Sequence, residues 1–331
     1  MRHAVLVALA VVGLADARAA EIDRSERLAV HGAQLYILTR GDDASAPVVL
    51  WLHGGPGGAE TPLFRLYDAE LERHLVVTYW DQRGAGRSYD PDADPKQLTV
   101  ARHLADLDAV VDHQRASLGR EKLALIGHSW GGTLGLLYAQ AHPEKVAAFI
   151  GVAPVVSELE RQRAQRDFAA AEARARGDAD AQTELARIGE PPWSAQQELA
   201  AQTLVDRYGG YFHRRPSFTW AALRAMAYGY AAPWEIPGFI RANNLSLEAM
   251  NRELLALDLN ASVPRIAVPV FFFLGRFDRQ VDARLAAAYL ERLDASAKRV
   301  VWFEESAHNV PFEEPEKFCA AVVEVLTPSA N

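Results

Sequence analysis

The sequence predicts an α/β fold, with a mostly parallel sheet, helices on both faces and an inserted helical cap. Three observations lead to this. Six short apolar runs have the length of buried strands, and helical stretches separate most of them. This alternation is typical of a parallel sheet covered on both sides. The alternation stops over residues 157–263, where the chain contains no buried-strand run.

The predicted strands follow in order along the chain. Residues 27–41 alternate apolar and polar side chains, with a break at His31-Gly32, which predicts a hairpin. The later runs are continuous and rich in β-branched or aromatic residues, as in strands buried on both faces. They cover residues 48–52, 75–80, 123–127, 146–152, 270–275 and 299–303.

The predicted helices lie between these runs. Residues 99–119 carry apolar residues at helical spacing, and Thr99 suits the N-cap position. A second helix, over 132–145, is stopped near Pro143. Residues 282–293 and 315–326 complete the set.

The block without strands is rich in Ala, Arg, Glu, Gln and aromatic residues. We interpret residues 157–263 as a helical cap and residues 20–156 and 264–331 as the α/β core. An insertion at the carboxyl ends of parallel strands can form a lid over a site.

Composition narrows the function classes. The chain has 43 acidic and 35 Lys and Arg residues, a net charge of −8, and no basic patch that indicates nucleic-acid binding. Its single cysteine, Cys319, excludes an internal disulfide framework and a cysteine-based metal site. No histidine or carboxylate cluster has metal-ligand spacing, so no metal is expected.

The N-terminus resembles an export signal. Arg2 and His3 precede an apolar run over 4–15, and Ala17 and Ala19 form an A-x-A cleavage pattern. The sequence therefore predicts that residues 1–19 are removed and that the mature protein is periplasmic or secreted. No later segment is long and apolar enough to cross a membrane.

The first candidate catalytic residue is Ser129. Gly127-His128-Ser129-Trp130-Gly131 matches G-x-S-x-G between a predicted strand and a predicted helix. In this context the serine occupies a strained turn that needs small flanking residues, and the turn presents its hydroxyl at a helix N-terminus.

A nucleophilic serine needs a base and an acid, which follow it in the order Ser, acid, His in this arrangement. Beyond the cap the sequence contains one histidine, His308, just after the last strand. Asp278 follows the preceding strand and is the predicted acid. Asp282 is the second choice, because it suits the start of the next helix better.

An oxyanion site needs two backbone N–H donors. One is predicted from Trp130, the residue after the nucleophile. The other is predicted from the glycine-rich loop His53-Gly54-Gly55-Pro56-Gly57, through Gly54 or Gly55. His53 is expected to orient this loop.

Four motifs, HGGPGG, DQRGAGRS, GHSWGG and GRFD, stand in an order that resembles the prolyl aminopeptidase (proline iminopeptidase) family of α/β-hydrolases, serine peptidase family S33. The resemblance implies triad roles for Ser129, Asp278 and His308. It also implies that Asp81 and Arg83 pair to brace the site.

The same resemblance implies that cap glutamates bind the substrate ammonium group. Glu235 in the segment PWEIPG is the partial match to one such element, and a match to the family's second element is not found.

We therefore expect a serine hydrolase that acts through an acyl-enzyme and requires no metal or organic cofactor. The expected substrates are short peptides that lose an N-terminal proline or small apolar residue. A carboxylesterase or amidase acting on small acyl compounds and a non-catalytic binding protein are the alternatives. The sequence does not indicate the oligomeric state.

Overall fold

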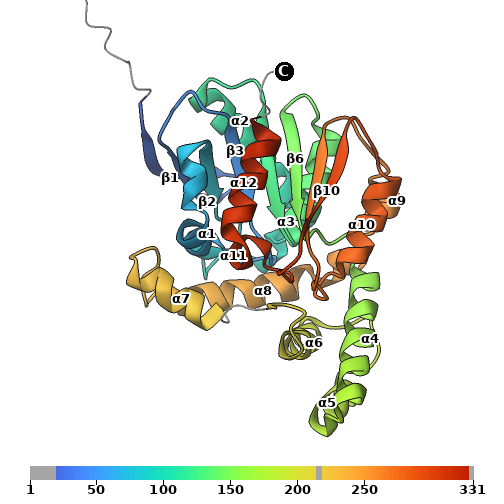
Figure 1. The fold of residues 1–331 in the computed structure, drawn as a ribbon. Coiled ribbons are helices and arrows are strands. Elements are labelled where there is room, and N and C mark those ends of the chain that lie inside the picture. Colours follow the sequence, from blue (N-terminus) through green and yellow to red (C-terminus); the bar gives the residue numbers. More distant parts are fainter. Residues whose placement is uncertain (1–19, 214–217, 328–331) are drawn as a thin grey trace, which may run out of the picture.

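The computed structural model describes residues 20–213 and 218–327, so the predicted export signal lies outside the described residues. In this part of the chain eight strands form one sheet, in the order β1-β2-β4-β3-β5-β6-β8-β10 (Figure 1). The β1–β2 and β2–β4 pairs are antiparallel, and all the others are parallel. The predicted mostly parallel sheet is confirmed.

All six apolar runs form strands of this sheet, and the predicted hairpin forms β1 and β2. His31 and Gly32 make its turn with φ of 44° and 78°. The strands are β1 Ile22–Val30, β2 Ala33–Gly41, β3 Val48–Leu52, β4 Val76–Trp80, β5 Leu123–His128, β6 Val146–Val152, β8 Val270–Gly275 and β10 Lys298–Phe303. Two further short strands, β7 Arg265–Ile266 and β9 Asp294–Ala295, pair with each other.

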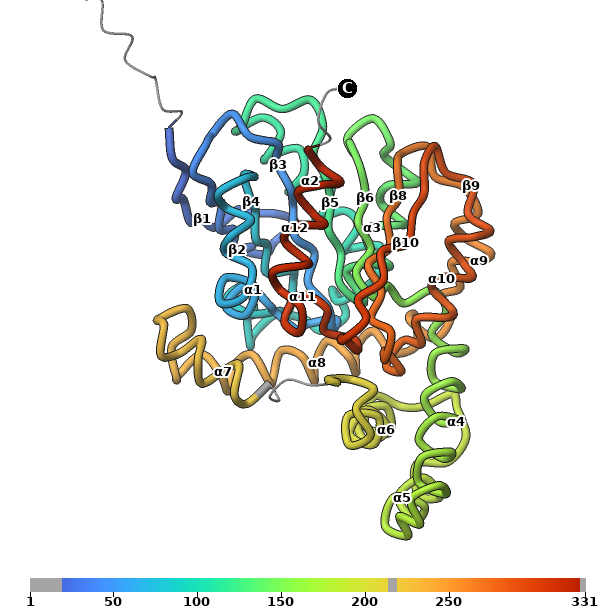
Figure 2. Tube along the Cα trace, in the orientation of Figure 1, coloured from blue at the N-terminus to red at the C-terminus, as the bar shows by residue number. Residues whose placement is uncertain are grey.

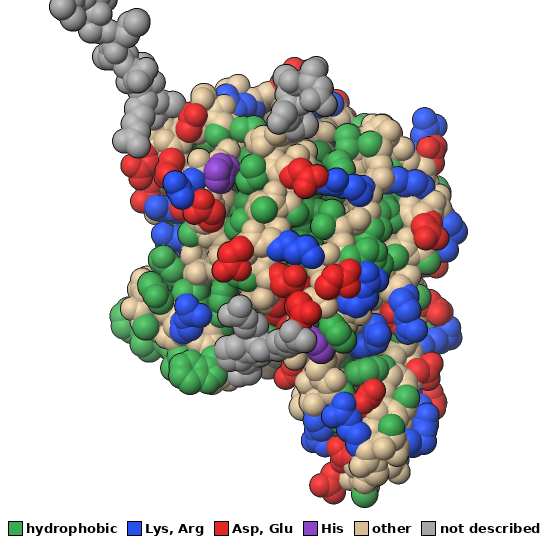
Figure 3. Space-filling model, viewed as in Figure 1, with side chains coloured by type: hydrophobic (Ala, Val, Ile, Leu, Met, Phe, Trp, Pro, Cys, Tyr) green, Lys and Arg blue, Asp and Glu red, His purple; other side chains and the backbone are tan. Residues whose placement is uncertain are grey.

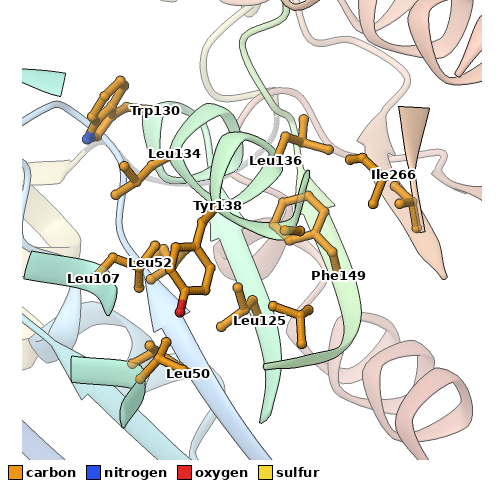
Figure 4. Close-up of a cluster of buried hydrophobic side chains, with 14 of the residues drawn as sticks. Leu50, Leu52, Leu107, Leu125, Trp130, Leu134, Leu136, Tyr138, Phe149 and Ile266 are labelled. Carbon is orange, nitrogen blue, oxygen red and sulfur yellow. The ribbon is translucent and has the colours of Figure 1, made fainter. Parts of the chain in front are cut away.

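Helices cover both faces of the sheet, because alternate side chains of the central strands point to opposite sides. In β3, Leu50 and Leu52 belong to a cluster that also contains residues of α2, α3 and α10, part of which Figure 4 shows. Val49 and Trp51 pack on the other face with α1, α11 and α12. The core helices are α1 Thr61–Tyr67, α2 Val100–Leu118, α3 Trp130–Ala141, α10 Ala283–Arg292, α11 Val310–Glu313 and α12 Pro315–Leu326.

The segment between β6 and β8 contains helices α4 to α9 and no strand other than β7 in its described residues. They are α4 Glu158–Arg176, α5 Ala179–Ile188, α6 Ala195–Arg207, α7 Phe218–Ala227, α8 Ile236–Leu255 and α9 Leu259–Ser262. Helices α4, α5 and α6 share a small apolar cluster that includes Ala173, Leu185 and Trp193. In Figure 2 these helices project from the core, whereas α8 runs along its lower edge.

Helix α8 packs directly on the glycine-rich loop. A Cβ added to Gly57 would lie 2.7 Å from the Cβ of Ser246, so the two backbones approach closely. On the outer side, α7, α8 and the loop between them expose large apolar side chains, seen as the green surface at the lower left of Figure 3. They are Trp220, Leu223, Tyr228, Trp234 and Ile240.

Among the described residues, no helix combines the length and apolar character that a membrane-spanning segment needs.

Candidate active site

Ser129 occupies a sharp turn between β5 and α3. Its φ of 53° and ψ of −117° lie in a region that residues other than glycine rarely adopt. The flanking glycines are required by packing. A Cβ on Gly127 would overlap the backbone of Gly131, and one on Gly131 would overlap the carbonyl oxygen of Leu52. The turn therefore explains the spacing of G-x-S-x-G in steric terms.

Asp278 and His308 are brought together although 30 residues separate them. The Nδ1 atom of His308 lies 3.1 Å from Oδ2 of Asp278, and both side chains are buried. The other carboxylate oxygen of Asp278 accepts the backbone N–H groups of Gln280 and Val281, at 2.8 and 3.1 Å. These bonds fix the orientation of the carboxylate, so that the Nδ1–H group of His308 donates to it. The Nε2 atom of His308 is then free to accept a proton from another group.

Asp282, the second choice for the acid, instead caps α10 and accepts the N–H of Arg284.

A cavity of about 400 Å³ joins this pair to the serine. Ser129 and His308 line it together, and its remaining walls come from both the core and the cap. Its apolar lining is Ala59, Pro62, Leu63, Leu199, Ala222, Ala225, Ala231, Ile236, Phe239, Ile240 and Leu247. Its other polar lining residues include Glu60, Glu198, Gln202, Tyr211, Asn243, Asn244 and Gln280.

The predicted oxyanion residues lie beside Ser129. Gly55 and Trp130 line, with Ser129, a recess of about 40 Å³, which has room for about one water-sized group. Trp130 is the first residue of α3, so its N–H is one of those that have no acceptor within the helix. Gly54 does not line either space, but a Cβ on it would come within 3.3 Å of the Ser129 Cβ.

Gln82 ties three loops together behind the serine. Its backbone N–H donates to Nε2 of His53, and its side-chain amide donates to the His53 carbonyl. The indole N–H of Trp130 donates to the Gln82 side-chain oxygen at 3.0 Å. His53 therefore orients the glycine-rich loop as expected, and Gln82, which the sequence analysis did not single out, links that loop to the nucleophile turn.

The predicted pairing of Asp81 with Arg83 is wrong. The Arg83 guanidinium binds both carboxylate oxygens of Asp106 in α2, at 2.7 and 2.9 Å. Asp81 instead accepts the hydroxyl of Thr61 and the backbone N–H of Arg87. Both residues brace the loops, but each does so through a partner that is distant in the sequence.

A family model described as the alpha/beta hydrolase fold matches residues 47–315. The chain belongs to the α/β-hydrolase family.

Within this family the chain is related to proline iminopeptidases and to the protein named "Probable aminopeptidase YbaC" of Bacillus subtilis (strain 168). It is 30% identical to YbaC over 300 residues, which are 88% of this chain and 93% of YbaC. A "Probable proline iminopeptidase" of Streptomyces coelicolor is 40% identical over 123 residues, which cover 36% of each chain. The solved structure of the proline iminopeptidase from Mycobacterium smegmatis covers 92% of this chain and 97% of its own, with a TM-score of 0.69 and 20% identity, a likeness of fold.

Glu235 does not line the cavity that Ser129 and His308 share. Its carboxylate binds the guanidinium of Arg87, at 2.8 and 3.2 Å, and accepts the N–H of Ala232. Burial acts to raise the pKa of Glu235, but the bonds from Arg87 and Ala232 outweigh it and lower the pKa. This geometry joins the cap to the core, and it does not support the predicted binding of a substrate amine by Glu235.

The cap contributes residues to the site that the sequence analysis missed. Glu198 of α6 lines both the cavity and the recess beside Ser129. Tyr211 accepts the backbone N–H of His308 through its carbonyl, and its ring stacks on the His308 ring with centroids 5.5 Å apart. Nothing in the spacing of these residues distinguishes them from other cap residues, because their position depends on how the cap folds back.

A metal site is not formed by the part of the chain that the structure describes, where no group of three or more His, Cys, Asp or Glu side chains is placed to hold an ion.

Proposed function

We propose that the protein is a serine hydrolase that works through an acyl-enzyme. Ser129 attacks a carbonyl carbon while His308 accepts its proton, and the buried Asp278 carboxylate stabilises the resulting imidazolium. The N–H groups of Trp130 and of the Gly54-Gly55 loop are the proposed donors to the oxyanion. His308 then protonates the leaving group and activates the water that releases the acyl group. The shared cavity of Ser129 and His308, beside the buried Asp278, carries this proposal.

We further infer that the substrate has a free N-terminal amine, which makes the enzyme an aminopeptidase. The relatives named above are called aminopeptidases or proline iminopeptidases. A carboxylate at the nucleophile supports the same assignment. Glu198 and Glu158 share one guanidinium, that of Arg161, and all three side chains are largely buried.

This cluster carries one more negative charge than positive charge when both glutamates are ionised. A buried unpaired carboxylate is costly unless a cation or a proton joins it. Burial raises the pKa of Glu198, and the Glu158 charge adds to this effect, although Arg161 opposes it. A substrate ammonium group at Glu198 supplies the missing positive charge, within reach of an acyl carbon held at Ser129.

The lining of the cavity suits an apolar residue. Its volume of about 400 Å³ lies in the range of small-ligand sites, roughly 300–1,000 Å³, and most of its walls are apolar. An N-terminal proline or small apolar residue, with part of the next residue, is the substrate that this combination favours.

Three chromogenic substrates separate aminopeptidase from esterase activity. A proline arylamide, its N-acetylated form and an aryl acetate offer the same triad three different acyl groups. We expect the free-amine arylamide to be hydrolysed with a kcat/KM well above that of the acetylated form. Equal rates with and without the free amine, together with rapid hydrolysis of the aryl acetate, would instead identify a carboxylesterase or amidase.

Glu198→Gln tests the amine subsite. Losing a hydrogen bond to a charged group costs about 1.5–3 kcal/mol, so kcat/KM for the proline arylamide should fall about 10- to 100-fold. Hydrolysis of the aryl acetate should change little, because this substrate has no amine. The matched control is Glu160→Gln on the exposed face of α4. An equal loss on both substrates would show that Glu198 supports the fold of the site rather than the amine.

The pH profile tests the assignment of His308. Burial lowers the pKa of His308 below its ordinary value of 6.5, with Asp278 acting in the opposite direction. Because the base must be neutral, kcat/KM should stay high as pH falls to 6.5 and should decline only below it. A profile that is already half-lost above pH 6.5 would contradict this order of effects.

A further inference from the structure

Another buried histidine, His128, packs against His308, the proposed base. It precedes Ser129 at the end of β5 and has 2% of its surface exposed. Its Nδ1 atom lies 2.6 Å from Oε1 of Glu60, and its Nε2 atom lies 3.1 Å from the backbone carbonyl oxygen of His308. Glu60 also lines the cavity, but neither His128 nor Glu60 takes part in the chemical steps proposed above.

These two contacts determine where the protons are. A carbonyl oxygen can only accept a hydrogen bond. The Nε2 atom of His128 must therefore carry a proton, and this N–H donates a hydrogen bond to the His308 carbonyl. A separation of 2.6 Å between Nδ1 and a carboxyl oxygen also requires a proton between them. With both nitrogens engaged in this way, the pair is a buried imidazolium and carboxylate that share one proton.

The pair touches His308 in two ways. Its hydrogen bond holds the His308 backbone in the loop after β10. The His128 ring also lies against the His308 ring, with centroids 4.8 Å apart and planes inclined by 36°. A positive charge at this distance opposes a second positive charge on His308.

We propose that Glu60 and His128 form a positioning pair that fixes the His308 loop and keeps the His308 ring neutral at lower pH. Glu60 acts through His128, and His128 acts through His308. The inference rests on the proposed base role of His308 but not on the choice between peptide and ester substrates.

Several other charged or titratable groups lie near the pair. Asp278 faces His308 from the loop after β8, and Tyr211 of the cap stacks on the His308 ring. His53 lies near the pair from the loop after β3, and burial lowers its pKa and so favours its neutral form. Two aromatic neighbours of the His128 ring, Trp51 and Phe312, are uncharged. Glu60 acts on the pKa of His308 in the opposite direction, because its negative charge favours the protonated ring, but its effect is smaller than that of His128. Among these neighbours the His128 imidazolium is therefore the positive group that faces His308.

The experiment is the pH dependence of Ser129 labelling by a fluorophosphonate, which needs the serine and its base but no particular substrate. Glu60→Gln keeps the size of the side chain and can donate to Nδ1 of a neutral His128. The bond to the His308 carbonyl then remains, and the positive charge is lost. We expect the acid limb of labelling to move to higher pH by a fraction of a unit, because the positive charge of His128 has more effect on His308 than the negative charge of Glu60.

His128→Leu removes the imidazole and its N–H donor to the His308 carbonyl, so we expect the plateau labelling rate to fall about tenfold or more. Glu70→Gln, on the exposed side of the same part of the core, is the matched control and should match the unaltered protein. Thermal unfolding of each variant identifies any loss that comes from the fold alone.

In the unaltered protein, the shared proton should give a strongly deshielded 1H resonance, which gives a readout even where a variant does not fold. An acid limb that stays in place in Glu60→Gln, or the absence of this resonance, would overturn the proposal. A raised KM for amine substrates with an unmoved limb would make Glu60 a substrate-binding residue instead. Failure of the unaltered protein to label at all contradicts the proposed function, which is a distinct result.

Discussion

Ser129→Ala should reduce turnover at least about 1,000-fold while the protein remains folded. In serine hydrolases with a triad, loss of the nucleophile removes the acyl-enzyme route, and only the contributions of binding and the oxyanion site remain. Alanine differs from serine only by the hydroxyl oxygen, and so the turn with φ of 53° gains no new clash. The measurements are the steady-state rate on an aryl acetate and covalent labelling by a fluorophosphonate.

Ser45→Ala, at an exposed serine in the loop before β3, is the matched control and should label as the unaltered protein does. Near-normal turnover by Ser129→Ala would remove Ser129 as the nucleophile. If the folded, unaltered protein neither labels nor turns over an ester, the non-catalytic binding protein becomes the better interpretation.

Arg83→Met should lower the free energy of unfolding by about 3–5 kcal/mol, the cost of leaving a buried charge without its partner. Arg83 binds both oxygens of Asp106, whose side chain is completely buried. The remaining ionic partner of Asp106 is His31, at 2.9 Å, which is positively charged only when protonated. Urea unfolding at neutral pH measures the difference.

The exposed pair of Arg276 and Glu304 is a matched control, because it has the same two-bond geometry at 2.8 and 2.7 Å. Arg276→Met should cost less than about 1 kcal/mol, as exposed ion pairs contribute little. The double variant Arg83→Met/Asp106→Leu should regain much of the stability, since no charge is left unpaired. Equal losses for Arg83→Met and Arg276→Met would show that burial does not decide the strength of the Arg83 pair.

Much of the fold could be predicted from the sequence because its signals are local. A strand buried on both faces must be apolar along its whole length, so each of the six runs could be identified without knowing its neighbours. The hairpin turn at His31-Gly32 and the cap of α2 by Thr99 likewise depend on adjacent residues; Thr99 accepts the N–H of Arg102 at 3.1 Å. The nucleophile turn could be predicted for the same reason, because packing within the turn and against β3 requires its glycines.

The partners of charged side chains could not be predicted, because each joins segments far apart in the chain. Arg83 was expected to pair with its near neighbour Asp81, yet it binds Asp106. Glu235 was expected to bind a substrate amine, yet it binds Arg87, which is 148 residues away. A charged side chain gives no local indication of its partner, and the lowest-energy pairing depends on which groups the packed elements bury together.

The sequence by itself determined the α/β core, the order of its strands along the chain and the three residues that we propose as nucleophile, acid and base. Apolar patterns and the need for glycine at a tight turn both depend on residues that are adjacent in the sequence. Parallel strands bring their carboxyl ends to one edge of the sheet, which places the three residues near one another. Only the tertiary structure decided that Glu198 lines the cavity and that Glu60 binds His128, which packs against His308. These contacts arise when the cap and the loops close over the sheet, where burial makes an unpaired charge costly and so selects its partner.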